Sequence, residues 1–245
     1  VTMQGRDLSS GNEGLISGNL RFTKENGSDE SVSLAQGYSV IYNGVADIEY
    51  NIYDFKGDYT ELTFLDNNRD GEYDIVFVDT YQSAVISSAG WSGKDIRVIF
   101  ESGGSLTLPA EGAGFFLFMQ TIDGGVVTPE MLESGDLITY AQSRNGKAVK
   151  LYAGDRVVSG NVEAVESGDK SFVHIDGERY EVHQAYFDAL EEGSSIAKEL
   201  KPGADAAFRL NKAGQIVALS SSNESGMFEY AVLLATDVEN GISGN

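Results

Sequence analysis

The sequence predicts an all-β fold, arranged as tandem antiparallel β-sandwich or barrel-like domains with one or two short helices. Runs of about four to eight residues rich in Val, Ile, Tyr, Phe and Thr recur along most of the 245-residue chain. Its 29 glycines, many of them within Asn-Gly, Asp-Gly and Ser-Gly pairs, place turn signals between these runs, and only three prolines interrupt them. Helical periodicity is sparse, so strands and tight turns account for most of the chain.

The predicted strands are spread over most of the sequence. They are Ser39–Tyr42, Tyr59–Leu65, Ile75–Tyr81, Ile96–Glu101, Phe115–Thr121, Leu137–Ser143, Ala148–Ala153, Asn161–Glu166, Phe172–Ile175 and Ile216–Ser220. Two connections are predicted as type I′ hairpin turns, at Asn145-Gly146 and at Asp176-Gly177, because that turn needs positive φ at both central residues. Helical signals are confined to Ala185–Glu192, with apolar residues at helical spacing, and to a short turn at Pro129–Glu133.

A faint internal repeat suggests two similar β units. Gly135–Leu151 aligns without gaps on Gly203–Leu219, with matching glycines and apolar positions. Chance similarity between two β-hairpins is the competing explanation. The Gly-containing stretch before Asn161 then suggests a first domain over residues 1–157 and a second over residues 158–245, which we expect to be cut at its C-terminal edge.

The amino-acid composition limits the classes of molecule that the chain can bind. The formal charge is −21, from 38 acidic and 17 basic residues, so nucleic acid and acidic membrane surfaces are disfavoured. Cysteine is absent, which excludes disulfides and thiolate metal sites. No apolar run approaches the length of a membrane span, so we expect no membrane insertion. An acidic chain without cysteine is compatible with an exported protein that meets abundant Ca²⁺, which predicts an extracellular, cell-surface or cell-wall location.

The sharpest local motif is the acidic stretch Asp66–Asp74. It places oxygen-bearing side chains at its first, third, fifth and ninth positions and Gly at its sixth, which is an arrangement that a hard cation such as Ca²⁺ requires. The predicted metal ligands are the side chains of Asp66, Asn68, Asp70 and Asp74 and the backbone carbonyl of Glu72. The loop is not an EF-hand, because Phe77 stands where the twelfth-position Glu would be.

A purely conformational role is the alternative for this loop, since Asp, Asn and Gly favour polar hairpin turns. The three aspartates within these nine residues repel one another without a cation, which favours structural Ca²⁺ over that alternative. Arg69 within the loop would lower the affinity.

Motifs of catalysis are absent, and no catalytic residue is predicted. No Gly-x-Ser-x-Gly elbow, Walker loop or His-Glu-x-x-His occurs, and no spacing singles out a carboxylate pair. His174 and His183 flank the Asp176-Gly177 turn and could approach each other as a two-histidine metal site, although ordinary surface histidines are the simpler interpretation. Trp91 and the tyrosines of the first third could stack on sugars, but packing within strands accounts for them equally.

Five blocks of the sequence carry a family resemblance. Tyr42–Val45, Leu62–Val78, Met131–Tyr140, Val158–Val165 and Ile175–Val182 are similar, in order and spacing, to blocks of exported Gram-positive surface proteins that also carry S-layer homology domains. The resemblance implies a β-rich, non-anchoring region of a long polypeptide, which domains outside this chain tether to the cell wall. It implies no catalytic activity.

The sequence therefore predicts a non-enzymatic structural or adhesive module of a bacterial cell-surface protein, stabilised by Ca²⁺ at the Asp66–Asp74 loop. Its expected partners are neighbouring domains of a longer chain, cell-wall polymers or other surface proteins. A carbohydrate-binding or cell-wall-polymer-binding module is the alternative.

Overall fold

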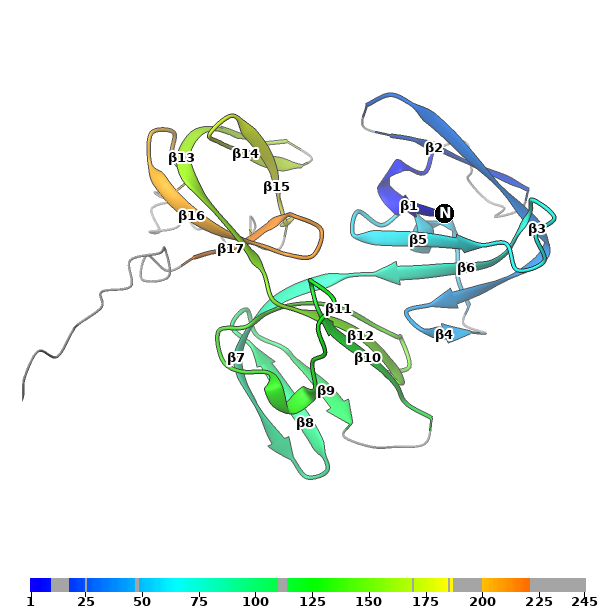
Figure 1. Cartoon of the computed structure of the whole chain (residues 1–245), viewed down its shortest axis with the longest axis horizontal. Coiled ribbons are helices and arrows are strands. Elements are labelled where there is room, and N and C mark those ends of the chain that lie inside the picture. Colours follow the sequence, from blue (N-terminus) through cyan, green and yellow to red (C-terminus); the bar gives the residue numbers. More distant parts are fainter. Residues whose placement is uncertain are drawn as a thin grey trace, which may run out of the picture.

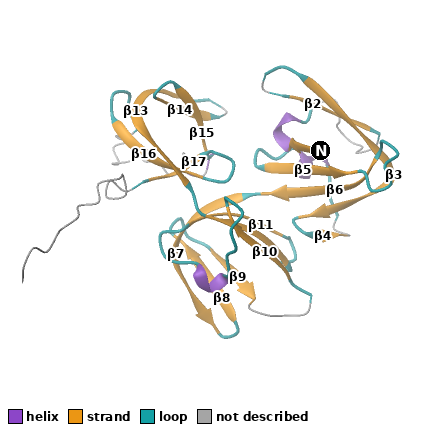
Figure 2. Ribbon diagram, in the orientation of Figure 1, coloured by secondary structure: helices purple, strands orange, loops and turns teal. Residues whose placement is uncertain are grey.

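Strands dominate the computed structural model, which describes residues 1–9, 18–24, 26–46, 49–109, 114–168, 170–184, 186 and 200–220. The helical elements described with their bounds are the single turn α1 (Ile52–Phe55) and the 3₁₀ turns η1 (Gly5–Asp7) and η3 (Pro129–Met131), and Gln184 and Tyr186 are also helical. Figure 2 shows how small their share is. The predicted all-β class with barrel-like domains and few helices is confirmed.

The strands form three successive units, here called units one, two and three (Figure 1). Unit one contains β1 (Thr2–Gln4), β2 (Asn19–Thr23), β3 (Asp29–Tyr42), β4 (Val45–Ala46), β5 (Thr60–Leu65) and β6 (Tyr73–Thr80). Unit two contains β7 (Gln82–Ser92), β8 (Asp95–Phe100), β9 (Ser105–Pro109), β10 (Phe116–Thr121), β11 (Leu137–Gln142) and β12 (Ala148–Ala153). Unit three contains β13 (Arg156–Glu166), β14 (Ser171–Ile175), β15 (Glu178–Val182), β16 (Asp205–Leu210) and β17 (Ile216–Leu219).

Unit three is a closed barrel with the strand order β13-β14-β15-β17-β16. Its first three strands form a meander, and its last two form a hairpin that pairs with both ends of that meander. Neighbouring strands are antiparallel except β15 and β17, which are parallel. A closed ring with an odd number of strands cannot alternate direction throughout, so one parallel pair is unavoidable.

Units one and two repeat this connectivity. In unit one the order is β1-β5-β6-β3-β2, with β3 and β6 parallel, and an antiparallel bridge between Leu8 and Phe22 joins the segment after β1 to β2. In unit two the order is β10-β12-β11-β7-β8-β9, with β10 and β12 parallel, so β9 and β10 share the place that one strand fills elsewhere. Five strand positions in this order form the Greek-key barrel of the OB-fold.

Each unit has its own apolar core, built by side chains that alternate between the inside and the outside of its strands. In β6, for example, Val76 and Val78 are buried in the core of unit one, so the intervening residues face outward. The fully buried aromatic rings include Phe22 and Phe55 in unit one and Phe208 in unit three. Each core is therefore local to one unit.

Every predicted strand overlaps an observed strand, and the predicted turns have different outcomes. Asp176 and Gly177 both have positive φ, 48° and 85°, which confirms the type I′ turn. The type I′ prediction for Asn145-Gly146 is wrong, because only Gly146 has positive φ. The turn spans more residues there: the N–H of Gly146 donates to Ser143 O, and the N–H of Ser143 donates to Ala148 O.

Of the predicted helical segments, Pro129–Glu133 is observed as η3. The predicted helix Ala185–Glu192 lies outside the described residues apart from Tyr186.

The internal repeat coincides with equivalent hairpins, formed by β11 and β12 in unit two and by β16 and β17 in unit three. Gly146 and Gly214 occupy the same place in the two turns, with φ of 68° and 79°. The residues of the predicted first domain, 1–157, hold two of the three cores, and its boundary with residues 158–245 lies inside β13. The division into domains stays a prediction.

Candidate functional site

The outward face of β6 is the place where the units meet. Its residues Phe77 and Asp79 point away from the core of unit one, and Tyr81 follows directly after the strand. Opposite them, Lys150 and Tyr152 alternate along β12 with core residues of unit two. Each of the two sheets therefore buries one face in the core of its own unit and packs its other face against the sheet of the neighbouring unit.

A buried ion pair lies at the centre of this contact. Lys150 Nζ donates to Asp79 Oδ2, and Asp79 is only 4% exposed. Its other carboxylate oxygen, Oδ1, has no hydrogen-bond partner within the described structure. Burial raises the pKa of Asp79; the contact with Lys150 opposes this rise, and the negative charge of Glu61 adds to it. This carboxyl group is desolvated, and only one of its two oxygens has a hydrogen-bond partner. It is therefore a high-energy feature of the interface.

Unit three contributes one cation to the same place. Lys212, in the turn between β16 and β17, lies over the rings of Tyr81 and Tyr152, with Nζ 5.1 and 4.7 Å from the ring centroids. The two rings are packed edge to face at 5.8 Å. Lys212 also pairs with Glu61 of β5 at 3.5 Å. A lysine from unit three is therefore enclosed by rings and a carboxylate from the other two units.

Asn43 forms a second link between units one and two. Its side chain is buried, accepts a hydrogen bond from Thr80 N at 2.8 Å and donates one to Gln142 O at 2.8 Å. Asn43 has φ of 45° and precedes Gly44 in the turn between β3 and β4. This turn directs the amide group towards unit two.

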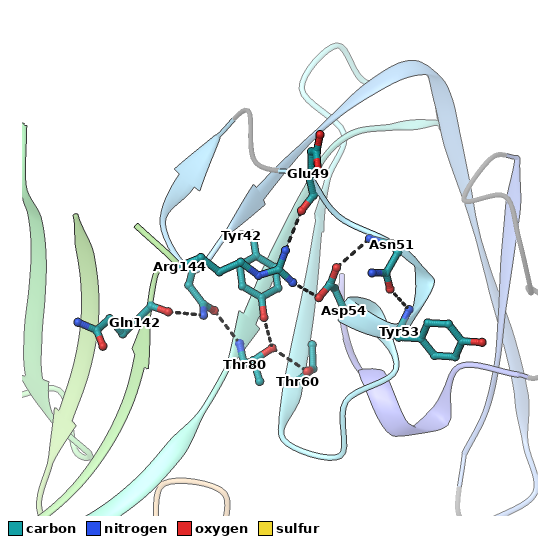
Figure 3. A network of polar contacts seen from close by, with 10 residues as sticks. Tyr42, Glu49, Asn51, Tyr53, Asp54, Thr60, Thr80, Gln142 and Arg144 are labelled. Carbon is teal, nitrogen blue, oxygen red and sulfur yellow. Dashed lines mark hydrogen bonds and ion pairs between the residues drawn. The ribbon is translucent and has the colours of Figure 1, made fainter. Parts of the chain in front are cut away.

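Arg144 of unit two is the third link, and it points into unit one (Figure 3). Its guanidinium group donates to Glu49 O at 2.8 Å, forms an ion pair with Asp54 and lies 4.7 Å from the ring centroid of Tyr42. Asp54 belongs to α1 and also accepts from Asn51 N, which completes the capping box of that helix. The same carboxylate therefore caps α1 and holds Arg144.

A cavity of about 490 Å³ opens where the three units come together. Aromatic rings and charged groups of both signs line it, which suits a polar ligand with flat faces better than an apolar one. Its lining includes Arg6, Tyr59, Glu61, Tyr81, Phe172, Arg179, Tyr180, Glu181, His183 and Lys212.

His183 forms one wall of this cavity and is buried. Its ring stacks on Tyr59 of unit one, with the centroids 4.1 Å apart and the planes at 10°. The Tyr59 hydroxyl accepts a hydrogen bond from Gln184 N at 2.8 Å, and His183 Nε2 has no partner within the described structure. Burial lowers the pKa of His183, an effect that Glu181 partly opposes.

The predicted metal ligands lie together in the loop between β5 and β6, and their oxygens face backbone amides. Asp66 accepts from Arg69 N at 2.6 Å and from Gly71 N at 3.0 Å. Asp74 accepts from Asn67 N at 2.8 Å. This arrangement is the polar turn that the alternative interpretation expects.

The remaining predicted ligands show the same pattern. Asn68 Oδ1 accepts from Asp70 N, and Asp70 Oδ1 accepts from Glu72 N at 2.9 Å. The Asn68 amide donates to Asp70 Oδ2 at 2.9 Å. Within the part of the chain that the structure describes, no group of three or more His, Cys, Asp or Glu side chains is arranged to hold a metal ion.

The two histidines do not meet. His174 pairs in register with Arg179 and forms a 2.6 Å contact with Glu166, whereas His183 stacks on Tyr59 of unit one. The predicted sugar-stacking aromatics do not form one accessible surface. Trp91 is 60% exposed in unit two and Tyr53 is 75% exposed on α1, whereas Tyr42 is buried in the core of unit one.

Sequence reasoning missed the residues that join the units, chiefly Asp79, Lys150 and Lys212. One signal was present for Asp79, since an acid stands between Phe77 and Tyr81 in a strand that is otherwise mostly apolar. No signal of this kind marks the two lysines, because lysine is common on outward strand positions and in turns.

The burial of His183 predicts a specific dependence of stability on pH. Because its pKa is lowered on folding from the usual value of about 6.5, the unfolded chain binds its proton first as pH falls, and stability decreases below that value. His183→Gln should flatten this decrease, whereas His174→Gln should leave it intact. Urea denaturation of the three proteins between pH 7.5 and 5 measures it, and identical slopes in all three would contradict the assignment.

Comparison with protein-family models and with curated proteins finds no match for this chain. No helix within the described residues is long and apolar enough to cross a membrane.

Proposed function

We propose that this chain is a non-enzymatic structural module of a bacterial cell-surface protein, which holds its three β units in a fixed arrangement. The observation that carries the proposal is the set of ion pairs between units. They are Arg6–Glu181, Asp54–Arg144, Asp58–Lys170, Glu61–Lys212 and Asp79–Lys150. Domains within one chain move relative to each other by default unless their interface is extensive. The several ion pairs between units therefore support a rigid assembly.

The net charge and the sequence resemblance support an extracellular location for such a module. The strong negative charge keeps the chain soluble and disfavours binding to nucleic acid. The five sequence blocks that resemble exported S-layer-type proteins support attachment to the cell surface through neighbouring domains. An adhesive role towards cell-wall polymers or other surface proteins belongs to the same proposal.

Rigidity can be measured directly because the chain contains no cysteine. Spin labels at Ser31→Cys in unit one and Lys94→Cys in unit two, both exposed, should give one narrow distance distribution by double electron–electron resonance. Arg144→Ala removes the contacts to Glu49 and Asp54 and should broaden it. Arg97→Ala, which loses only a contact to Ser105 within unit two, is the matched control. A broad distribution in the parent protein would contradict a rigid module.

Ca²⁺ at the Asp66–Asp74 loop remains part of the proposal. Carboxylates accept more than one partner per oxygen, so Asp66 and Asp70 can coordinate an ion while they keep their backbone contacts. Binding would raise the melting temperature with Ca²⁺ concentration. We expect this rise in the parent protein and in Asp123→Asn, a control at another exposed turn, but a reduced rise in Asp70→Asn. Equal melting temperatures with Ca²⁺ and with chelator would remove the metal from the proposal.

Carbohydrate binding is the second candidate function, and the cavity between the units is the observation that favours it. Arg179 lies 3.3 Å from the ring centroid of Phe172 at its wall, so flat and polar surfaces adjoin there. Pull-down on purified cell-wall polysaccharide should then retain the parent protein and lose Arg179→Ala. If Trp91→Ala loses binding instead, the exposed ring is the site. The carbohydrate function is wrong if the parent protein does not bind.

A further inference from the structure

An amine and a carboxyl group are in direct contact inside the junction of units one and two. Lys150 Nζ contacts Asp79 Oδ2, and the two residues are separated by 71 positions in the sequence. The Asp79 side chain is 6% exposed and that of Lys150 is 20% exposed. Asp79 stands on β6 and Lys150 on β12, so each is held by a paired strand.

This pair differs from the other lysine–carboxylate pairs of the described residues. In Lys24–Glu30, Lys170–Asp58 and Lys212–Glu61 the carboxylate side chains are 27% exposed or more. Water solvates both charges in those pairs. At Asp79, by contrast, solvent is excluded and Oδ1 has no partner within the described structure.

The surroundings favour the uncharged form of the Asp79 carboxyl group, whose pKa burial raises. Lys150 Nζ lies 5.9 Å from the ring centroid of Phe77, and the packed rings of Tyr81 and Tyr152 adjoin the pair. Desolvation disfavours the ion pair relative to a neutral carboxylic acid and a neutral amine. Glu61 is the register partner of Asp79 on β5, and its negative charge acts in the same direction on the carboxyl group.

We propose that Lys150 and Asp79 become joined by an intramolecular amide bond, which covalently links units one and two. A proton passes from the ammonium group to the carboxylate and leaves a neutral amine and a carboxylic acid. The amine nitrogen attacks Asp79 Cγ, a C–N bond forms, and the C–OH bond breaks. The hydroxyl group takes one of the two amine protons and leaves as water, while the other proton stays on the amide nitrogen, so the step needs no oxidant, cofactor or second substrate.

Confinement of the amine and the carboxyl group gives them the high effective concentration that the free reactants lack. Amine and acid in water have little tendency to condense, but groups held in contact react with effective concentrations of up to about 10⁵–10⁸ M. The Asp79 side chain is only 6% exposed, which limits the access of water for the reverse reaction. Glu61 acts as a positioning residue, because its negative charge raises the pKa of Asp79 and so favours the carboxylic acid that the amine attacks.

The experiment is mass spectrometry of the purified, folded chain. We expect an intact mass lower by one water molecule, and a branched peptide that joins the segments around residues 79 and 150 after digestion. Lys150→Arg keeps the charge but cannot condense, so it should have its full mass and a lower melting temperature. Lys24→Arg, at an exposed pair, should still lose one water. Glu61→Gln should fold and show a smaller linked fraction.

Two outcomes overturn the inference. One is a full, unmodified mass for the folded parent protein. The other is a loss of water that persists in Lys150→Arg, because the Asp-Gly pairs of the sequence, such as Asp70-Gly71, can lose water by local cyclisation. The result is independent of the proposed function: a rigid module can hold together through the ion pair alone, and the bond can form in a protein of another function.

Discussion

The contact between the outward faces of β6 and β12 is the interaction on which the arrangement of this chain depends. It has an unusual composition for a contact between strands, because an acid and an amine are enclosed by Tyr81, Tyr152 and Phe77. Lys212 of unit three inserts over the same tyrosine rings, so all three units converge within one small volume. Removal of one partner from such a buried pair leaves an uncompensated charge, which is far more costly than the loss of an exposed ion pair.

The three units share one connectivity, and each uses the loop between its last two strands differently. The turn between the last two strands carries Arg144 in unit two and Lys212 in unit three, and both residues reach into unit one. In unit three Asn211 also donates to Ser83 of unit two. In unit one the equivalent loop is the acidic segment Asp66–Asp74, which is largely exposed and closed by its own side-chain-to-backbone hydrogen bonds. The same loop of a common fold therefore contacts unit one when it belongs to units two and three, and forms an exposed acidic loop in unit one.

The distribution of charge follows from this arrangement. With 17 basic residues against 38 acidic ones, the cations are scarce, and several of them are used between units. In addition to the lysines between β6 and β12, Arg209 of unit three forms an ion pair with Asp155 and donates a hydrogen bond to Gly135 O of unit two. The outer surface is left strongly acidic, which favours solubility and attraction of cations, while the interior contacts are electrostatically matched.

The sequence by itself determined the barrel-like all-β class and ten of the seventeen described strands, because alternation and turn chemistry are local properties. The Asp176-Gly177 turn is an example, since both residues must accept positive φ and both do. At Asn145-Gly146 the same local rule failed, because Ser143 and Ala148 close a longer turn whose residues serve the contact of Arg144 with unit one. The predicted oxygens of the acidic loop are adjacent in sequence, so their proximity was also foreseeable.

Only the tertiary structure decided which outward-facing residues would meet. Asp79 and Lys150 lie 71 positions apart on strands of different units, and their side chains point away from the cores that the apolar pattern reveals. The parallel pair of unit three likewise follows from closing a ring of five strands, which no single strand encodes. The contacts between units therefore depend on the closure and packing of whole barrels, whereas hydrophobic periodicity reports only on each barrel's own interior.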